Sequence, residues 1–136
     1  GEKLDIKRYE MLTSSGTVAC YSHAGGRFGV LVALDKADKN DLAYDVAMQV
    51  AAANPRYINP EDVAADELNK EKEIYKEQLI KEGKPENMVD KIIPGKLAKF
   101  YGEICLTKQE YIKDDSKKME DILGDVKVEK FIRYSL

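Results

Sequence analysis

Two segments near the start of the chain alternate apolar and polar residues, which is typical of strands with one buried face. They are residues 4–9 and 17–23, and the polar residues 13–16 separate them. We therefore expect two antiparallel strands joined by a turn. Residues 28–34 are apolar on both faces, so a third strand should lie in the centre of the sheet and be covered by another element.

The segment after the third strand changes to helical periodicity. Apolar residues recur at helical spacing between residues 40 and 53. Asn40 or Asp41 can cap the start of this helix, and Asn54-Pro55 ends it. The pattern predicts that this helix covers the central strand.

A pair of longer helices is predicted in the middle of the chain. Residues 64–81 are rich in Glu, Lys, Leu and Ala with only a narrow apolar stripe, and residues 82–85 (EGKP) end that helix. The second helix, residues 86–104, has a continuous apolar face, although Pro94 should kink or restart it. Two helices joined by a short turn indicate an antiparallel helical hairpin, zipped as a coiled coil.

The last part of the chain returns to the alternating pattern. A short strand is expected at Tyr111-Ile112, a short helix at residues 117–123 ending at Gly124, and a final strand at residues 126–136. The whole pattern predicts an α+β fold, in which a small antiparallel sheet packs with helices. The hairpin of residues 59–104 is then an excursion from a core formed by residues 1–58 and 105–136.

Charge and composition narrow the class of protein. The chain has 22 basic and 25 acidic residues and a net charge of −3, so binding to nucleic acid through phosphate attraction is not expected. It has no apolar stretch long enough to cross a membrane and no signal peptide, so we expect a soluble, cytoplasmic protein. Cys20 and Cys105 are far apart in sequence, and we expect both to be buried, reduced thiols.

Catalytic and metal-binding chemistry finds little support in the sequence. His23 is the only histidine, so neither a zinc site nor a cysteine–histidine pair can be built from residues at ligand spacing. We expect no metal, no cofactor and no enzymatic activity. Gly25, Gly26 and Gly29 superficially resemble a phosphate loop, but they join two strands, and a hairpin turn explains them. From pattern alone, His23 at the tip of this hairpin is either a surface histidine or a contact for a partner.

Five segments in chain order resemble elongation factor Ts. They are YSHAGGRFGVLV at residues 21–32, AMQVAAANPRYI at residues 47–58, EGKP at residues 82–85, KIIPGKLAKF at residues 91–100 and QEYIKDD at residues 109–115. Pro94 and Glu110 depart from the residues usual in the family, and both departures lie in peripheral segments.

The resemblance implies a translation factor that binds elongation factor Tu and promotes exchange of GDP for GTP. It implies that this region docks on the third domain of Tu through His23, Tyr111, Ile112 and Lys113. It also implies that the family's N-terminal helical module and its TDFVAK segment, which disturbs the nucleotide site, lie outside these residues. We therefore expect this part of the protein to supply docking, and the coiled coil allows a homodimer.

Two other classes of function stay open at this stage. The first is a structural module that associates with itself through the helical hairpin and has no exchange activity of its own. Sedimentation with and without Tu distinguishes it, because a dimer that ignores Tu would favour self-association. The second is an enzyme with His23 as the base, which would need a concave pocket with a second titratable group near that residue.

Overall fold

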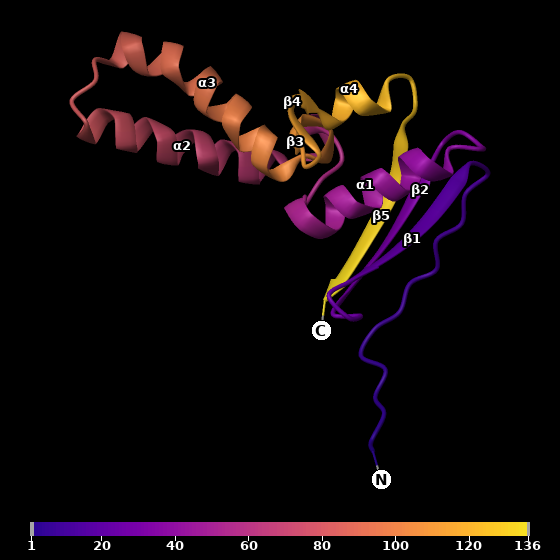
Figure 1. Ribbon diagram of the computed structural model, residues 1–136. Coiled ribbons are helices and arrows are strands. Elements are labelled where there is room, and N and C mark those ends of the chain that lie inside the picture. The colour runs from indigo at the N-terminus through magenta and orange to yellow at the C-terminus, as the bar shows by residue number, and fades with distance from the viewer. Residues whose placement is uncertain (1, 136) are drawn as a thin grey trace.

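The computed structural model describes residues 2–135 and has a mixed α+β architecture. Three antiparallel strands form the main sheet in the order β1-β2-β5: β1 is Thr17–His23, β2 is Phe28–Leu34 and β5 is Val128–Ser135. The expected central position of β2 is therefore confirmed. Helix α1, Asn40–Ala53, lies across one face of this sheet, as the pattern predicted (Figure 1).

The start of β1 is held against the segment that connects β2 to α1, by a close approach of the two backbones and by a threonine side chain. A Cβ atom added to Gly16 would lie 1.9 Å from the carbonyl oxygen of Leu34, so only glycine fits there. Thr17 Oγ1 donates to the carbonyl of Lys36 at 2.7 Å and accepts from the amide of Lys39 at 3.0 Å. The expected cap at Asn40 or Asp41 was wrong, because the N-cap is Lys39 and no side chain caps it. Thr17, which sits on the neighbouring strand, satisfies the Lys39 amide instead.

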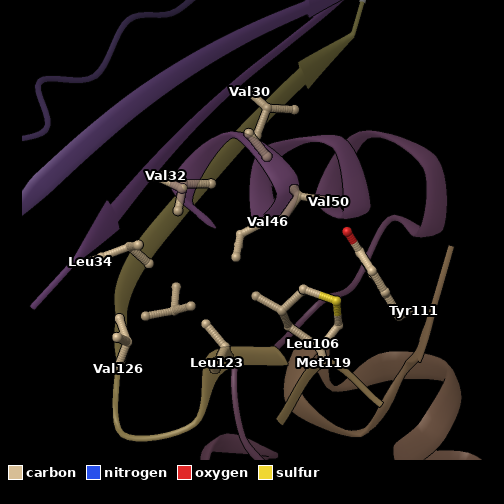
Figure 2. Close-up of a cluster of buried hydrophobic side chains, with 13 residues drawn as sticks. Val30, Val32, Leu34, Val46, Val50, Leu106, Tyr111, Met119, Leu123 and Val126 are labelled. Atoms are coloured by element: carbon tan, nitrogen blue, oxygen red, sulfur yellow. The ribbon is translucent and has the colours of Figure 1, made fainter. Parts of the chain in front are cut away.

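The hydrophobic core lies between the sheet, α1 and the segment that follows the helical pair. That segment contains the 3-10 helix η2 (Leu106–Lys108), the strands β3 (Glu110–Tyr111) and β4 (Asp114–Lys118), and helix α4 (Met119–Leu123). Figure 2 shows valines of β2 and α1 facing Leu106, Met119 and Leu123. The expected helix at residues 117–123 begins two residues later than predicted, because Lys117 and Lys118 belong to β4, where Lys118 pairs with Glu110.

The helices α2 (Ala65–Lys81) and α3 (Glu86–Ile104) lie side by side and antiparallel: α2 runs away from the rest of the molecule and α3 returns to it (Figure 1). The apolar stripe predicted on α3 faces inward, and Leu79 of α2 is buried against it. Helix α3 continues through Pro94 without restarting, contrary to one of the two expectations. Pro94 and Asp90 are both exposed, so water can hydrate the carbonyl that loses its partner.

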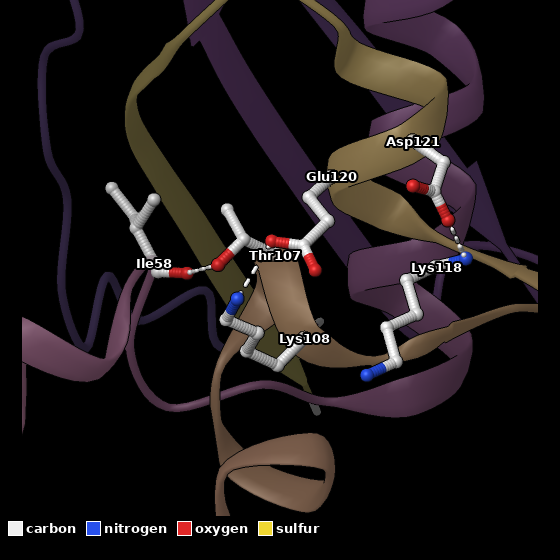
Figure 3. A network of polar contacts seen from close by, with 6 residues as sticks. All are labelled: Ile58, Thr107, Lys108, Lys118, Glu120 and Asp121. Atoms are coloured by element: carbon white, nitrogen blue, oxygen red, sulfur yellow. Dashed lines mark hydrogen bonds and ion pairs between the residues drawn. The ribbon is translucent and has the colours of Figure 1, made fainter.

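A short neck, formed by residues 56–58 and 105–108, joins the helical pair to the rest of the molecule. Tyr57 and Cys105 form a parallel bridge, and the amide of Leu106 donates to the carbonyl of Tyr57 at 2.8 Å. The 3-10 helix η1 (Pro60–Asp62) follows Tyr57 closely in the chain. In Figure 3, Thr107 Oγ1 donates to the carbonyl of Ile58, and Lys108 forms an ion pair with Glu120 of α4. The amide of Arg56 donates to the carbonyl of Ile104 at 2.9 Å, so the neck is bonded to both the core and the helical pair.

Two expectations about the start of the chain were wrong. Residues 4–9 form no strand, because they run past the end of β5 without a ladder partner, and Leu4 and Ile6 are exposed. Cys20 is exposed on the sheet face opposite α1, since Ala19 and Tyr21 are the β1 residues that turn toward the core. Cys105 is buried as expected, and burial raises the pKa of its thiol to about 11. The last residue of the expected final strand, Leu136, and Gly1 lie outside the described residues.

Candidate partner-binding surface

His23 lies at the end of β1, immediately before the turn to β2. Ala24, Gly25 and Gly26 all have positive φ, which makes the turn tight and leaves the imidazole exposed. The ring is held from one side, because Tyr21 Oη and His23 Nδ1 are 2.9 Å apart. The ring centroids of His23 and Phe28 are 6.4 Å apart. The imidazole of His23 is thus exposed at the tip of the hairpin and is held in place by Tyr21 and Phe28.

The three adjacent residues of the second candidate segment have different surroundings. Tyr111 is 8% exposed and extends into the core (Figure 2), where burial raises the pKa of its phenol. Ile112 is 47% exposed, and Lys113 is also exposed. Tyr111 therefore fixes the segment to the core, whereas Ile112 and Lys113 are accessible from outside.

Helix α1 connects the two candidate segments. Lys113 Nζ lies 2.7 Å from Asp45 Oδ1, and this hydrogen bond raises the pKa of Lys113 above its ordinary value. The neighbouring Tyr44 packs edge-to-face on Tyr21, with ring centroids 5.4 Å apart. Because Tyr21 in turn contacts His23, the helix links the hairpin tip to Lys113 through adjacent residues.

Tyr44 was missed by the sequence analysis. Its side chain is 47% exposed at a position of α1 that faces away from the core. The available signal was its place in the helical pattern, since a large aromatic residue falls between the buried positions Ala43 and Val46. We define the docking surface as His23, Tyr44, Ile112 and Lys113, with Tyr21 and Tyr111 supporting it.

This surface is mainly aromatic and apolar, with one exposed ion pair. A pair such as Lys113 and Asp45 contributes little to stability, because water screens it. Its lysine can exchange Asp45 for a carboxylate on another protein at small cost. Aromatic side chains are enriched at protein interfaces, so the exposed Tyr44 makes this surface a candidate for a protein contact.

Other sites offer less. No group of three potential metal ligands occurs among residues 2–135. One groove lies between the N-terminal segment, the β1–β2 hairpin and the end of β5, and His23 is not among the residues that line it. It gives no support to a reading in which His23 acts as a base. In the part of the chain that the structure describes, no helix is both long and apolar enough to cross a bilayer.

Comparison with known proteins gives one consistent family. The family model described as "Elongation factor TS" matches residues 1–136. A protein of Halothermothrix orenii named elongation factor Ts is 40% identical over 142 residues, covering 100% of this chain and 47% of the relative. One of Nautilia profundicola with the same name is 43% identical and is covered to 50%, again over the whole of this chain.

A third relative is shorter. The elongation factor Ts of Syntrophus aciditrophicus is 42% identical over 152 residues, covering 100% of this chain and 76% of the relative. The chain therefore spans about half the length of the first two relatives and three quarters of the third.

Proposed function

This chain belongs to the elongation factor Ts family, and we propose on that premise that it binds elongation factor Tu and serves the exchange of GDP for GTP on that partner. The observation that supports docking by this region is the surface built beside α1. His23, Ile112 and Lys113 are all exposed there, although they come from two segments far apart in sequence. Tyr111 anchors the second segment in the core.

The proposed mechanism is a conformational linkage without covalent chemistry. A protein that binds Tu more tightly when the nucleotide is absent must weaken the nucleotide by the same factor. In this mechanism no covalent bond is made or broken, so we propose that the protein acts as an exchange factor and not as an enzyme. The role of residues 1–136 is to supply affinity and orientation for the complex. Because translation is cytoplasmic, the proposal implies a cytoplasmic protein.

Calorimetric titration tests this proposal directly. We expect the chain to bind nucleotide-free Tu more tightly than Tu loaded with GDP. Release of fluorescently labelled GDP from Tu, followed with increasing amounts of the chain, measures how much exchange this region supports. Equal affinity for both forms of Tu would contradict the linkage, and no binding to either form would contradict docking.

We also propose a division of the chain. Residues 1–58 and 105–136 form the docking core, and residues 59–104 form a helical excursion. The burial of Leu79 and Val89 between α2 and α3 supports a short coiled coil. A second candidate function for this excursion is self-association, since Ile74, Ile80 and Met88 are exposed on it. Sedimentation over a range of concentrations, with and without Tu, separates a homodimer from a monomer that binds Tu.

A further inference from the structure

A glutamine in the middle of α1 is completely buried beside the docking surface. Gln49 is 0% exposed, and both ends of its side-chain amide are used. Its Oε1 accepts a hydrogen bond from the backbone amide of Ile112 at 2.9 Å. Its Nε2 donates to the backbone carbonyl of Glu110 at 3.0 Å. One side chain therefore bonds the backbone on both sides of Tyr111.

A second buried glutamine completes this polar cluster. Gln109 is 3% exposed, and its Nε2 donates to the carbonyl of Glu103 at 3.0 Å and to that of Ala53 at 3.4 Å. These carbonyls belong to the last turns of α3 and α1, where helices leave acceptors without intrahelical partners. Gln49 Nε2 lies 3.4 Å from Gln109 Oε1. The amide of Gln49 is thus held in one orientation.

The position of Gln49 on α1 is significant because Asp45 lies one turn earlier on the same helix. Asp45 holds the side chain of Lys113, while Gln49 holds the backbone of residues 110–112. The pairing of β3 with β4 is irregular between Glu110 and Tyr111, so the strand ladder alone does not fix this backbone. Helix α1 supplies the missing bonds.

The chemistry of the site indicates why an amide stands there. The neighbours of Gln49 on α1, Val46 and Val50, are buried and apolar, and an apolar side chain is the usual choice at such a position. Such a side chain would leave the Ile112 amide and the Glu110 carbonyl without these partners. A buried polar group is favourable only where its bonds are made, and here both are made to the segment that carries Ile112 and Lys113.

We propose that Gln49 is a positioning residue for partner binding: its two hydrogen bonds set the backbone conformation in which Ile112 and Lys113 are presented to Tu. This inference rests on the proposed function, because it takes Tu as the partner that contacts these residues. Gln49 itself is buried and contacts no partner. It acts through the backbone of the segment.

The first test replaces both bonds at nearly constant volume. In Gln49→Met we expect cooperative unfolding to persist, the Ile112 amide to exchange with solvent at least about tenfold faster, and affinity for Tu to fall about tenfold. Amide exchange followed by NMR and calorimetric titration with Tu measure these effects. Gln78→Met is the matched control, because Gln78 is exposed on α2 and should change neither quantity.

The second test uses Gln49→Glu, which can recover the bonds by protonation. A neutral carboxyl can donate to the Glu110 carbonyl and accept from the Ile112 amide, whereas a carboxylate can only accept. Burial raises the pKa of such a carboxyl, so its affinity for Tu relative to wild type should recover as the pH is lowered from about 8 to 5. Dividing the affinity of the variant by that of wild type at each pH cancels effects that both proteins share, including those of His23, Asp45 and Lys113, which lie in the same region.

Each outcome decides the inference. It is overturned if the Ile112 amide keeps its protection in Gln49→Met, or if protection is lost while affinity for Tu is unchanged. A Gln49→Glu defect that does not depend on pH would overturn it too, and this variant decides the question should Gln49→Met fail to fold. If wild type does not bind Tu, the proposed function fails instead. The exchange rate of the Ile112 amide then still shows whether Gln49 holds the segment.

Discussion

The phenol of Tyr57 donates a 2.6 Å hydrogen bond to Oε2 of Glu67, joining the neck to the first turn of α2. This bond raises the pKa of Tyr57 and lowers that of Glu67. Arg56 bonds the other oxygen of the same carboxylate, and its guanidinium lies 5.7 Å from the centre of the Tyr57 ring. The orientation of the helical pair is therefore tied to the neck through side chains as well as through the backbone.

Removing the Tyr57 hydroxyl should loosen the helical pair without unfolding the core. In Tyr57→Phe the ring keeps its packing but Glu67 loses a charge-assisted bond. We expect a broader distribution of distances between spin labels at Lys84, in the turn between α2 and α3, and at Lys130 on β5. The comparison variant is Tyr101→Phe, which removes a hydroxyl group from a tyrosine of α3. An unchanged distribution in Tyr57→Phe would mean that the backbone bonds of the neck suffice.

Acid should weaken the same contact. The folded state lowers the pKa of Glu67 because the carboxylate accepts bonds from Tyr57 and Arg56, so the unfolded chain takes up the proton more readily. The contribution to stability is fully present above the ordinary pKa of 4.5 and is lost as the pH falls through the lower folded value. Urea unfolding across this range should be less pH-dependent in Glu67→Gln than in wild type. Parallel curves would show that other carboxylates dominate.

The docking surface can be tested by truncation. His23→Ala and Ile112→Ala should each weaken Tu binding by about 1–2 kcal/mol, or roughly five- to thirtyfold. Because Ile112 is 47% exposed, its truncation should change the free energy of unfolding by only about 0.5 kcal/mol, not the 2–5 kcal/mol of a core isoleucine.

Ile80→Ala is the matched control for Ile112→Ala. Ile80 is 52% exposed but lies on α2, away from the docking surface, so its truncation should leave Tu affinity unchanged. If neither His23→Ala nor Ile112→Ala weakens binding, the docking surface lies elsewhere on the molecule.

The helical pair should be removable. No buried residue of the principal core cluster comes from residues 59–104, within the part of the chain described. The amide of Tyr57 donates to the carbonyl of Ile104 at 3.0 Å, so the two ends of the excursion are adjacent. Replacing residues 60–103 by a short Gly/Ser linker should leave a domain that unfolds cooperatively in urea. A gradual, non-cooperative transition would show that the excursion belongs to the core.

Elements with strong local signals could be predicted from the sequence. Helix α1 was predicted with its observed bounds, because its apolar spacing and Asn54-Pro55 are local features. The strand predicted at residues 4–9 was wrong for the opposite reason. Alternation shows only that a segment could line a sheet face, and whether a partner strand is available depends on the rest of the fold.

The candidate site shows the same division. The sequence named His23 and residues 111–113 as candidates, but it could not show how α1 connects the two segments or that Tyr111 is buried. The contacts that do so join residues distant in the chain: Asp45 with Lys113, and Tyr21 with Tyr44. The exposure of Cys20 was likewise unpredictable, since it depends on which face of the sheet α1 covers.

The parallel bridge between Tyr57 and Cys105 has a consequence for the order of folding. The core needs residues on both sides of the excursion, and bringing the ends of a long flexible loop together has an entropic cost that grows with its length. Helices α2 and α3 pair through contacts close in sequence. Their pairing brings Cys105 back beside Tyr57. We therefore expect the helical excursion to form early in folding. Once formed, it lowers the entropic cost of bringing residues 105–135 to the strands β1 and β2.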